Sequence, residues 1–143
     1  MPEGLAGWNR RRPLEAARAP EGLAAAGLTV GRAVEARLHP VALEGRDKPE
    51  AASEKGGRPS SGFGGLFAFS VSEAGVYRIA LGAAAWVDVA GDDGPLASVG
   101  HAHGPACSGI RKMVDFALAP GRYRLMLSKA DRANLPVMIV RLR

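Results

Sequence analysis

Most of the side chains that could carry chemistry lie between residues 98 and 116, in the stretch SVGHAHGPACSGIRKMVDF. If residues 99–103 are extended, His101 and His103 point to the same side, close enough for both imidazoles to bind one metal ion. Cys107 follows a few residues later, and a thiolate beside two imidazoles suits copper or zinc. With His39 or Asp88 as a further ligand, these residues form a candidate metal site.

The same residues also fit a polar turn between two strands, which needs no metal. His-x-His supplies only two ligands, whereas a closed zinc site has four and an open one has three protein ligands. Cys107 as a nucleophile would need a neighbouring base, and its small neighbours are typical of an inert thiol. The sequence predicts no catalytic residue, and it leaves the metal site and the polar turn as alternatives.

A second group of candidates, Trp86, Arg111 and Lys112, would bind a ligand. Trp86 occupies an outward position, where its ring could stack on a sugar or a base. Lys112 alternates in step with apolar positions, so it points toward the core or the open end of the fold. Its ammonium group would then either pair with a carboxylate, such as Asp88 or Asp93, or extend to water.

The charge of the chain favours anionic partners, because the net charge is +5 and the pI is about 10.0. Arginines recur at positions expected to face outward, and such a stripe could hold an anionic envelope polymer: Arg37, Arg78, Arg111, Arg122, Arg124 and Arg141. No nucleic-acid-binding motif accompanies them, so nucleic acid is not an expected partner. A protein partner remains the other possibility.

The elements that must position these residues are strands. Apolar and polar residues alternate with a period of two from residue 34 onward, and turns rich in Gly, Asp and Pro separate the segments. We expect seven or eight strands, among them residues 34–39, 66–71, 76–81, 85–90, 110–118, 123–128 and 135–143. Their short connections predict an all-β fold, an antiparallel β-sandwich of jelly-roll type.

With 143 residues, the chain is long enough for one core. Residues 1–27 are rich in Ala, Pro, Gly and Arg, and we expect a loosely ordered segment that is extended or partly helical. Residues 28–143 form the predicted sandwich domain. Within it, residues 44–65 combine charges with glycine, proline and serine, which is typical of a mobile loop.

The strand and turn pattern resembles that of bacterial pre-peptidase C-terminal domains, which are small jelly-roll sandwiches. The matching positions are core and turn residues and imply no active site: Phe69, Val71, Gly75, Tyr77, Ile79, Val87, Val89, Gly94, Phe116, Pro120, Gly121, Tyr123 and Leu125. Two further stretches, YRIALGAAAWVDV and GHAHGPACSGIRKMVDFALAPGRY, resemble small exported proteins of proteobacteria, some of which carry the label homogentisate 1,2-dioxygenase.

The resemblance to exported proteins implies a periplasmic or secreted location. No apolar window is long enough to span a membrane, and the first twenty residues lack the apolar run of a signal peptide. We therefore expect either a mature exported form or, alternatively, a cytoplasmic protein. The expected function is a non-enzymatic module that binds a ligand or partner.

The dioxygenase label implies the alternative function, a non-haem metal-dependent dioxygenase. Such an enzyme holds iron with two histidines and one carboxylate. His101 and His103 would then recruit an aspartate, namely Asp88, Asp92 or Asp93, because no glutamate follows Glu73.

Overall fold

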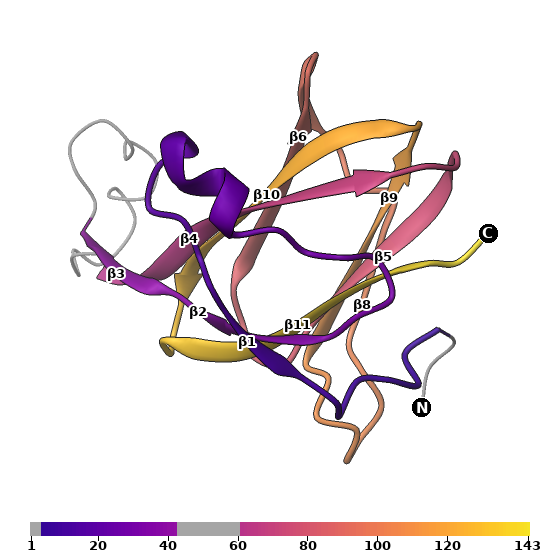
Figure 1. The fold of residues 1–143 in the computed structure, drawn as a ribbon. Coiled ribbons are helices and arrows are strands. Elements are labelled where there is room, and N and C mark those ends of the chain that lie inside the picture. The colour runs from indigo at the N-terminus through magenta and orange to yellow at the C-terminus, as the bar shows by residue number, and fades with distance from the viewer. Residues whose placement is uncertain (1–3, 43–60) are drawn as a thin grey trace.

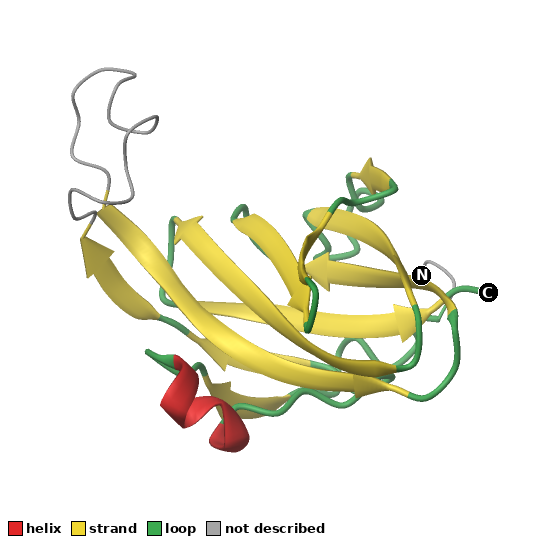
Figure 2. Cartoon of the chain, turned by 90° about the horizontal axis from the view of Figure 1, so that it is seen from above, coloured by secondary structure: helices red, strands yellow, loops and turns green. Residues whose placement is uncertain are grey.

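The computed structural model describes residues 4–42 and 61–143, which form two β-sheets that lie face to face (Figure 1, Figure 2). Sheet A runs in the order β1 (Arg12–Glu15), β2 (Val34–Arg37), β11 (Asn134–Arg141), β5 (Gly75–Leu81), β9 (Lys112–Leu118) and β8 (Gly100–Ala102). Sheet B runs in the order β3 (His39–Ala42), β4 (Ser61–Val71), β10 (Gly121–Ala130), β6 (Trp86–Gly91) and β7 (Gly94–Leu96). A short 3-10 helix, η1 (Pro20–Ala25), lies beside β4.

The predicted all-β antiparallel sandwich is confirmed, because β1 with β2 is the one parallel pair among the described strands. The sequence predicted seven or eight strands, whereas the described residues contain eleven. The additional strands β1, β3, β7 and β8 have only three or four residues each. Segments this short show little alternation, and among strands of this length only β2 was recognised, as part of the longer alternation over residues 34–39.

The space between the sheets holds the larger of two hydrophobic clusters, which we call the main cluster. Successive side chains of a strand point to opposite faces, so every second residue enters this space. Alternate residues of four strands are buried here: Phe67, Phe69 and Val71 of β4, Tyr77, Ile79 and Leu81 of β5, Val114, Phe116 and Leu118 of β9, and Leu125 and Leu127 of β10.

The outer face of sheet A carries a second cluster, formed by Leu5, Trp8, Ala33, Ala80, Ile110, Met113, Met138 and Val140. Leu5 and Trp8 come from the N-terminal segment and are 0% and 1% exposed. The segment is extended in β1 and helical in η1, as expected, but residues 4–27 are packed more closely than the predicted loose order. Its composition gave no sign of this, because the buried residues follow no regular period: Leu5 and Trp8 enter the second cluster, and Ala16, Ala17 and Ala26 enter the main cluster.

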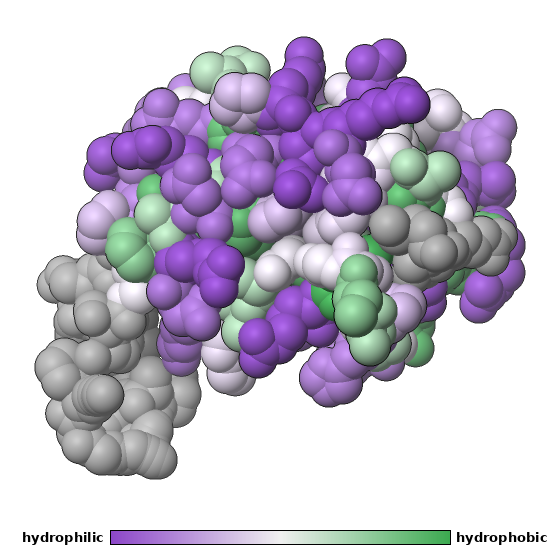
Figure 3. All heavy atoms as spheres, turned by 90° about the horizontal axis from the view of Figure 1, so that it is seen from below, coloured by the Kyte–Doolittle hydropathy of each residue, from purple (hydrophilic) through white to green (hydrophobic). Residues whose placement is uncertain are grey.

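Seen from the side opposite to that of Figure 2, the surface is mainly hydrophilic, with small and separate hydrophobic areas (Figure 3). Within sheet A, an ion pair joins two neighbouring strands. Arg78 of β5 lies directly opposite Asp115 of β9 and donates two hydrogen bonds to its carboxylate, at 2.8 and 3.0 Å. This predicted outward arginine therefore contributes to strand pairing within sheet A.

The predicted mobile loop of residues 44–65 is wrong at its C-terminal end, because β4 begins at Ser61. Residues 44–60 lie outside the described part of the chain. Gly62 and Gly64 indicated a loop, but they permit close backbone contact instead: a Cβ at Gly64 would lie 2.7 Å from the carbonyl oxygen of Leu127. The β10 register against β4 shifts between Leu127 and Ala130, which marks a β-bulge at this contact.

Candidate functional site

A cavity of about 520 Å³, which we call the Trp86 pocket, opens at one end of the sandwich. The residues before and at the start of β6, the end of β8, the start of β9 and the bulge of β10 all meet here. Its lining contains five of the eight residues that the sequence proposed for metal or ligand binding, together with residues that it did not propose: Ala84, Ala85, Trp86, His101, Ala102, His103, Arg111, Lys112 and Lys129.

Trp86 begins β6 and is 60% exposed, although large aromatic side chains are usually mostly buried. The alternation of β6 explains its direction, since Val89, three residues on, lies on the opposite face and is buried. The ammonium nitrogen of Lys129 lies 4.8 Å from the centre of the Trp86 ring, within range of a cation–π interaction. The indole therefore forms an apolar surface next to a positive charge.

Lys129 was not proposed from the sequence, and its position depends on the bulge in β10. Its backbone has a φ of 56°, a left-handed conformation that is uncommon for a residue other than glycine. A bulge redirects a side chain relative to the regular strand, and here Lys129 reaches the ring of Trp86. The glycines of β4 that accommodate the bulge were the available sequence signal, but they were interpreted as a loop.

Lys112 begins β9, is half-buried and lines the pocket. Its ammonium group donates a 2.7 Å hydrogen bond to the carbonyl oxygen of Ala85. This backbone partner replaces the carboxylate of Asp88 or Asp93 that the sequence suggested. Because a carbonyl oxygen is neutral, the interaction holds the ammonium group in place and leaves its charge uncompensated.

His101 and His103 are exposed and line the same pocket. His101 belongs to the edge strand β8, where it pairs with Val114 of β9. Two imidazoles therefore stand near the three cationic side chains of the pocket. Both histidines that the sequence proposed as metal ligands thus line one pocket.

Cys107 lies in the turn that follows the histidines, and it is exposed with a φ of 65°. The turn is closed by Ser108, whose hydroxyl donates to the carbonyl oxygen of Pro105 at 2.7 Å and accepts from the amide of Ile110 at 3.1 Å. Cys107 is absent from the lining of the Trp86 pocket. These hydrogen bonds make residues 105–110 a turn between β8 and β9.

The remaining predicted metal ligands are elsewhere. His39 is buried, and its Nε2–H donates to the carbonyl oxygen of Ala16 at 2.9 Å, with a carboxylate oxygen of Glu15 at 3.4 Å. Asp88 is exposed on β6, paired with Met126 of β10. The structure thus does not unite His39, Asp88 and Cys107 with the two histidines.

In residues 4–42 and 61–143, no group of three or more His, Cys, Asp or Glu side chains is arranged to hold a metal ion. A structural or catalytic zinc site and a non-haem iron site each need at least three protein ligands. The described residues therefore do not form the three-ligand zinc or iron site considered from the sequence.

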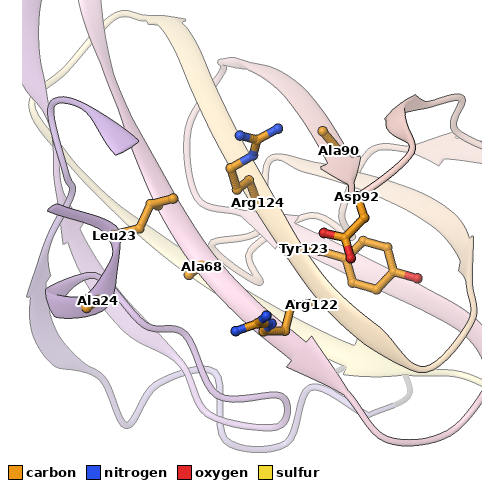
Figure 4. A pocket seen from close by; sticks show the side chains of 9 residues that line it. Leu23, Ala24, Ala68, Ala90, Asp92, Arg122, Tyr123 and Arg124 are labelled. Atoms are coloured by element: carbon orange, nitrogen blue, oxygen red, sulfur yellow. The ribbon is translucent and has the colours of Figure 1, made fainter. Parts of the chain in front are cut away.

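A second cavity, of about 500 Å³, lies on the outer face of sheet B (Figure 4). Arg122 and Arg124 rise from β10, Ala68 of β4 forms part of the floor, and Leu23 of η1 stands at the rim. Asp92 also lines this cavity, so its charge is mixed. It is consequently a weaker candidate for an anion than the Trp86 pocket, which has no acidic residue in its lining.

No helix in the described part of the chain is both long and apolar enough to cross a membrane. Comparison of the sequence with models of known protein families found no match, and comparison with curated protein sequences found none either.

Proposed function

We propose that the protein is a non-enzymatic β-sandwich module that binds an acidic saccharide in the Trp86 pocket. One observation carries the proposal: Arg111, Lys112 and Lys129 converge with an exposed tryptophan on a cavity whose lining contains no Asp or Glu. A concave site with charges of one sign concentrates the electric field and attracts ligands of the opposite sign. The pocket therefore favours an anion with an apolar face.

An acidic sugar combines these two properties. The C–H groups of a pyranose ring can pack against the indole of Trp86, since an aromatic face is apolar with a negative quadrupole. The carboxylate of the sugar can accept charge-assisted hydrogen bonds from Arg111 and Lys129. Each contact at an exposed site is weak by itself. Their combination on one cavity gives the specificity.

Nucleic acid fits the pocket less well, although it is also anionic. Proteins that bind single strands stack successive bases on several aromatic side chains. Among the described Trp, Tyr and Phe residues, only Trp86 is exposed. A single stacking surface suits one ring of a saccharide better than a run of bases.

We further propose that the module acts in the envelope or as a secreted protein. The resemblance of residues 77–89 and 100–123 to small exported proteins supports this location. Acidic polysaccharides are common outside the cell, and a net charge of +5 favours association with them.

Titration calorimetry with tetragalacturonate at fixed ionic strength tests the proposed function. We expect Trp86→Ala to weaken binding by about tenfold or more, because a stacked ring contributes about 1–3 kcal/mol. Arg124→Ala is the matched control, since it removes a charge from the outer face of sheet B and leaves the pocket intact. Equal affinity for a neutral oligosaccharide of the same length, or unchanged binding by Trp86→Ala, would contradict the proposal.

A further inference from the structure

A third cavity, of about 590 Å³, lies at the N-terminal segment and is lined by four arginines, Arg10, Arg11, Arg12 and Arg32. The Trp86 pocket shares none of these residues. We infer that this arginine cavity is a separate site that binds a phosphate group.

Two turns that are distant in the sequence form the walls of the arginine cavity. The first is held by hydrogen bonds from the amide of Trp8 to the carbonyl oxygen of Leu5 and from Arg10 to Gly7, both at 3.0 Å. Leu5 and Trp8 are buried in the second cluster, so this turn is attached to sheet A. The arginines that follow it are consequently held at a defined place on the surface.

The second turn brings Arg32 to the opposite wall. Its amide donates to the carbonyl oxygen of Thr29 at 3.0 Å, and the amide of Gly31 donates to Ile139 of β11 at 2.7 Å. Gly31 has a φ of 90°, a conformation that favours glycine. Gly31 therefore permits a tight turn, and this turn places Arg32 in the same cavity lining as Arg10 and Arg12.

Arg11 differs from the other three arginines, because its interactions within the protein are satisfied. Its guanidinium donates to the carbonyl oxygen of Trp8 at 2.9 Å and to the carboxylate of Glu35 at 3.0 Å, and it lies 5.6 Å from the centre of the Trp8 ring. It thus acts as a support for the cavity wall. Its positive charge is compensated by Glu35.

Arg10, Arg12 and Arg32 are exposed, and no carboxylate of the described residues forms an ion pair with them. The lining of the cavity contains no acidic residue. Three guanidinium groups with uncompensated charge therefore border one concavity. An isolated surface arginine is ordinary, but three around one cavity give it a positive potential that attracts an anion.

The chemistry of the guanidinium group selects phosphate as the anion. Its planar arrangement of N–H donors matches two oxygens of a phosphate at once, and several such groups can share the oxygens of one tetrahedral anion. The lining contains no exposed aromatic ring and no lysine, in contrast to the Trp86 pocket. The arginine cavity is therefore suited to a compact and highly charged group rather than to a sugar ring.

Calorimetric titration with inorganic pyrophosphate tests the inference. We expect one molecule bound per chain, and we expect the double variant Arg10→Ala with Arg32→Ala to weaken binding by about a hundredfold. The double variant Arg37→Ala with Arg124→Ala removes the same charge from exposed positions outside the cavity and is expected to bind as the wild type does. The midpoint of urea unfolding checks that each variant remains folded.

The conservative double variant Arg10→Lys with Arg32→Lys separates guanidinium recognition from general attraction. It keeps the charge and loses the paired donors, so we expect a loss of about tenfold. The inference would be overturned if the Arg10→Ala with Arg32→Ala variant, or its lysine counterpart, bound pyrophosphate as tightly as the wild type does. Loss of binding in the Arg37→Ala with Arg124→Ala control would overturn it as well.

Two sources could supply the phosphate group, a small soluble compound or a lipid head group. Sedimentation with vesicles of phosphatidylcholine and phosphatidic acid distinguishes them: binding to these vesicles without binding to pyrophosphate supports a lipid source. The inference would be overturned if the protein bound neither pyrophosphate nor these vesicles. It would also be overturned if, with a nucleic-acid duplex as a third probe, the protein bound the duplex alone. Trp86→Ala should bind pyrophosphate normally, so the two proposed sites fail or succeed separately.

Discussion

The two hydrophobic clusters lie on opposite faces of sheet A and are built in different ways. The main cluster joins two sheets through side chains that alternate along long strands. The second cluster joins sheet A to a short segment through Leu5 and Trp8. β11 contributes to both, with Ile139 on one face and Met138 and Val140 on the other.

This difference predicts how the protein unfolds when a residue of either cluster is replaced. Loss of contacts between the sheets affects strand pairing throughout the molecule, so unfolding is expected to be global. Loss of contacts beneath the N-terminal segment can be met by local detachment of that segment. The clusters thus support two levels of stability in one domain.

The largest effect is expected from Phe116→Ala in the main cluster. Phe116 is 2% exposed and pairs with Tyr77 across β5 and β9. Removal of its ring should lower the free energy of unfolding by about 4 kcal/mol, as the lost burial and the cavity left behind both contribute. Urea unfolding followed by circular dichroism measures the change. The control Phe116→Leu should lose only about 1 kcal/mol, and an equal loss would argue against the packing explanation.

A smaller and localised effect is expected from Trp8→Ala in the second cluster. Trp8 is 1% exposed, and its loss should cost about 3 kcal/mol, at the lower end for a buried tryptophan because the segment can rearrange. Native-state hydrogen exchange should show faster exchange at the amides of Trp8 and Arg10, with the order of protection in β10 unchanged. If all strands lost protection equally, the two clusters would form a single cooperative unit.

Gly64→Ala acts outside both clusters and gives the smallest effect. A Cβ at this position meets the backbone of β10, which cannot move aside as a flexible side chain can. We expect a loss of about 1–2 kcal/mol, measured as a shift of the urea midpoint. Gly27→Ala is the control, since no atom lies within 4 Å of its added Cβ. A similar midpoint for both variants would show that the bulge adapts.

The fold could be predicted to the extent that it follows alternation. Phe67, Phe69, Tyr77 and Ile79 read as inward residues, and each of them is buried in the main cluster. The second cluster was predictable only in part: alternation groups Met138, Val140 and Leu142 on one face, but its other members outside the strands follow no common period, namely Leu5, Trp8, Ala33 and Ile110. Ile110 illustrates the limit: it shares the parity of Val114, but it precedes β9 and packs in the second cluster instead.

The candidate site was predictable in its residues more than in its chemistry. Trp86, His101, His103, Arg111 and Lys112 were proposed from the sequence, and all of them line one pocket. Of the proposed metal ligands outside the pocket, His39 and Asp88 were chosen by residue type, which carries no information about distance, and Cys107 by its nearness in sequence. Conversely, Lys129 lies in a strand whose alternation predicts its direction incorrectly at the bulge. Arg32 is distant in the sequence from the other three arginines of the arginine cavity, and the pairing of β1 with β2 brings all four to one place.

The placement of the two tryptophans gives this chain a pair of built-in optical probes. Trp8 is enclosed beneath the N-terminal segment, whereas Trp86 is open to solvent at the candidate pocket. A soluble quencher of indole emission can reach the second ring and not the first. Emission from the shielded indole therefore reports on folding, and emission from the accessible one reports on occupancy, so one sample can separate damage to the scaffold from loss of a ligand.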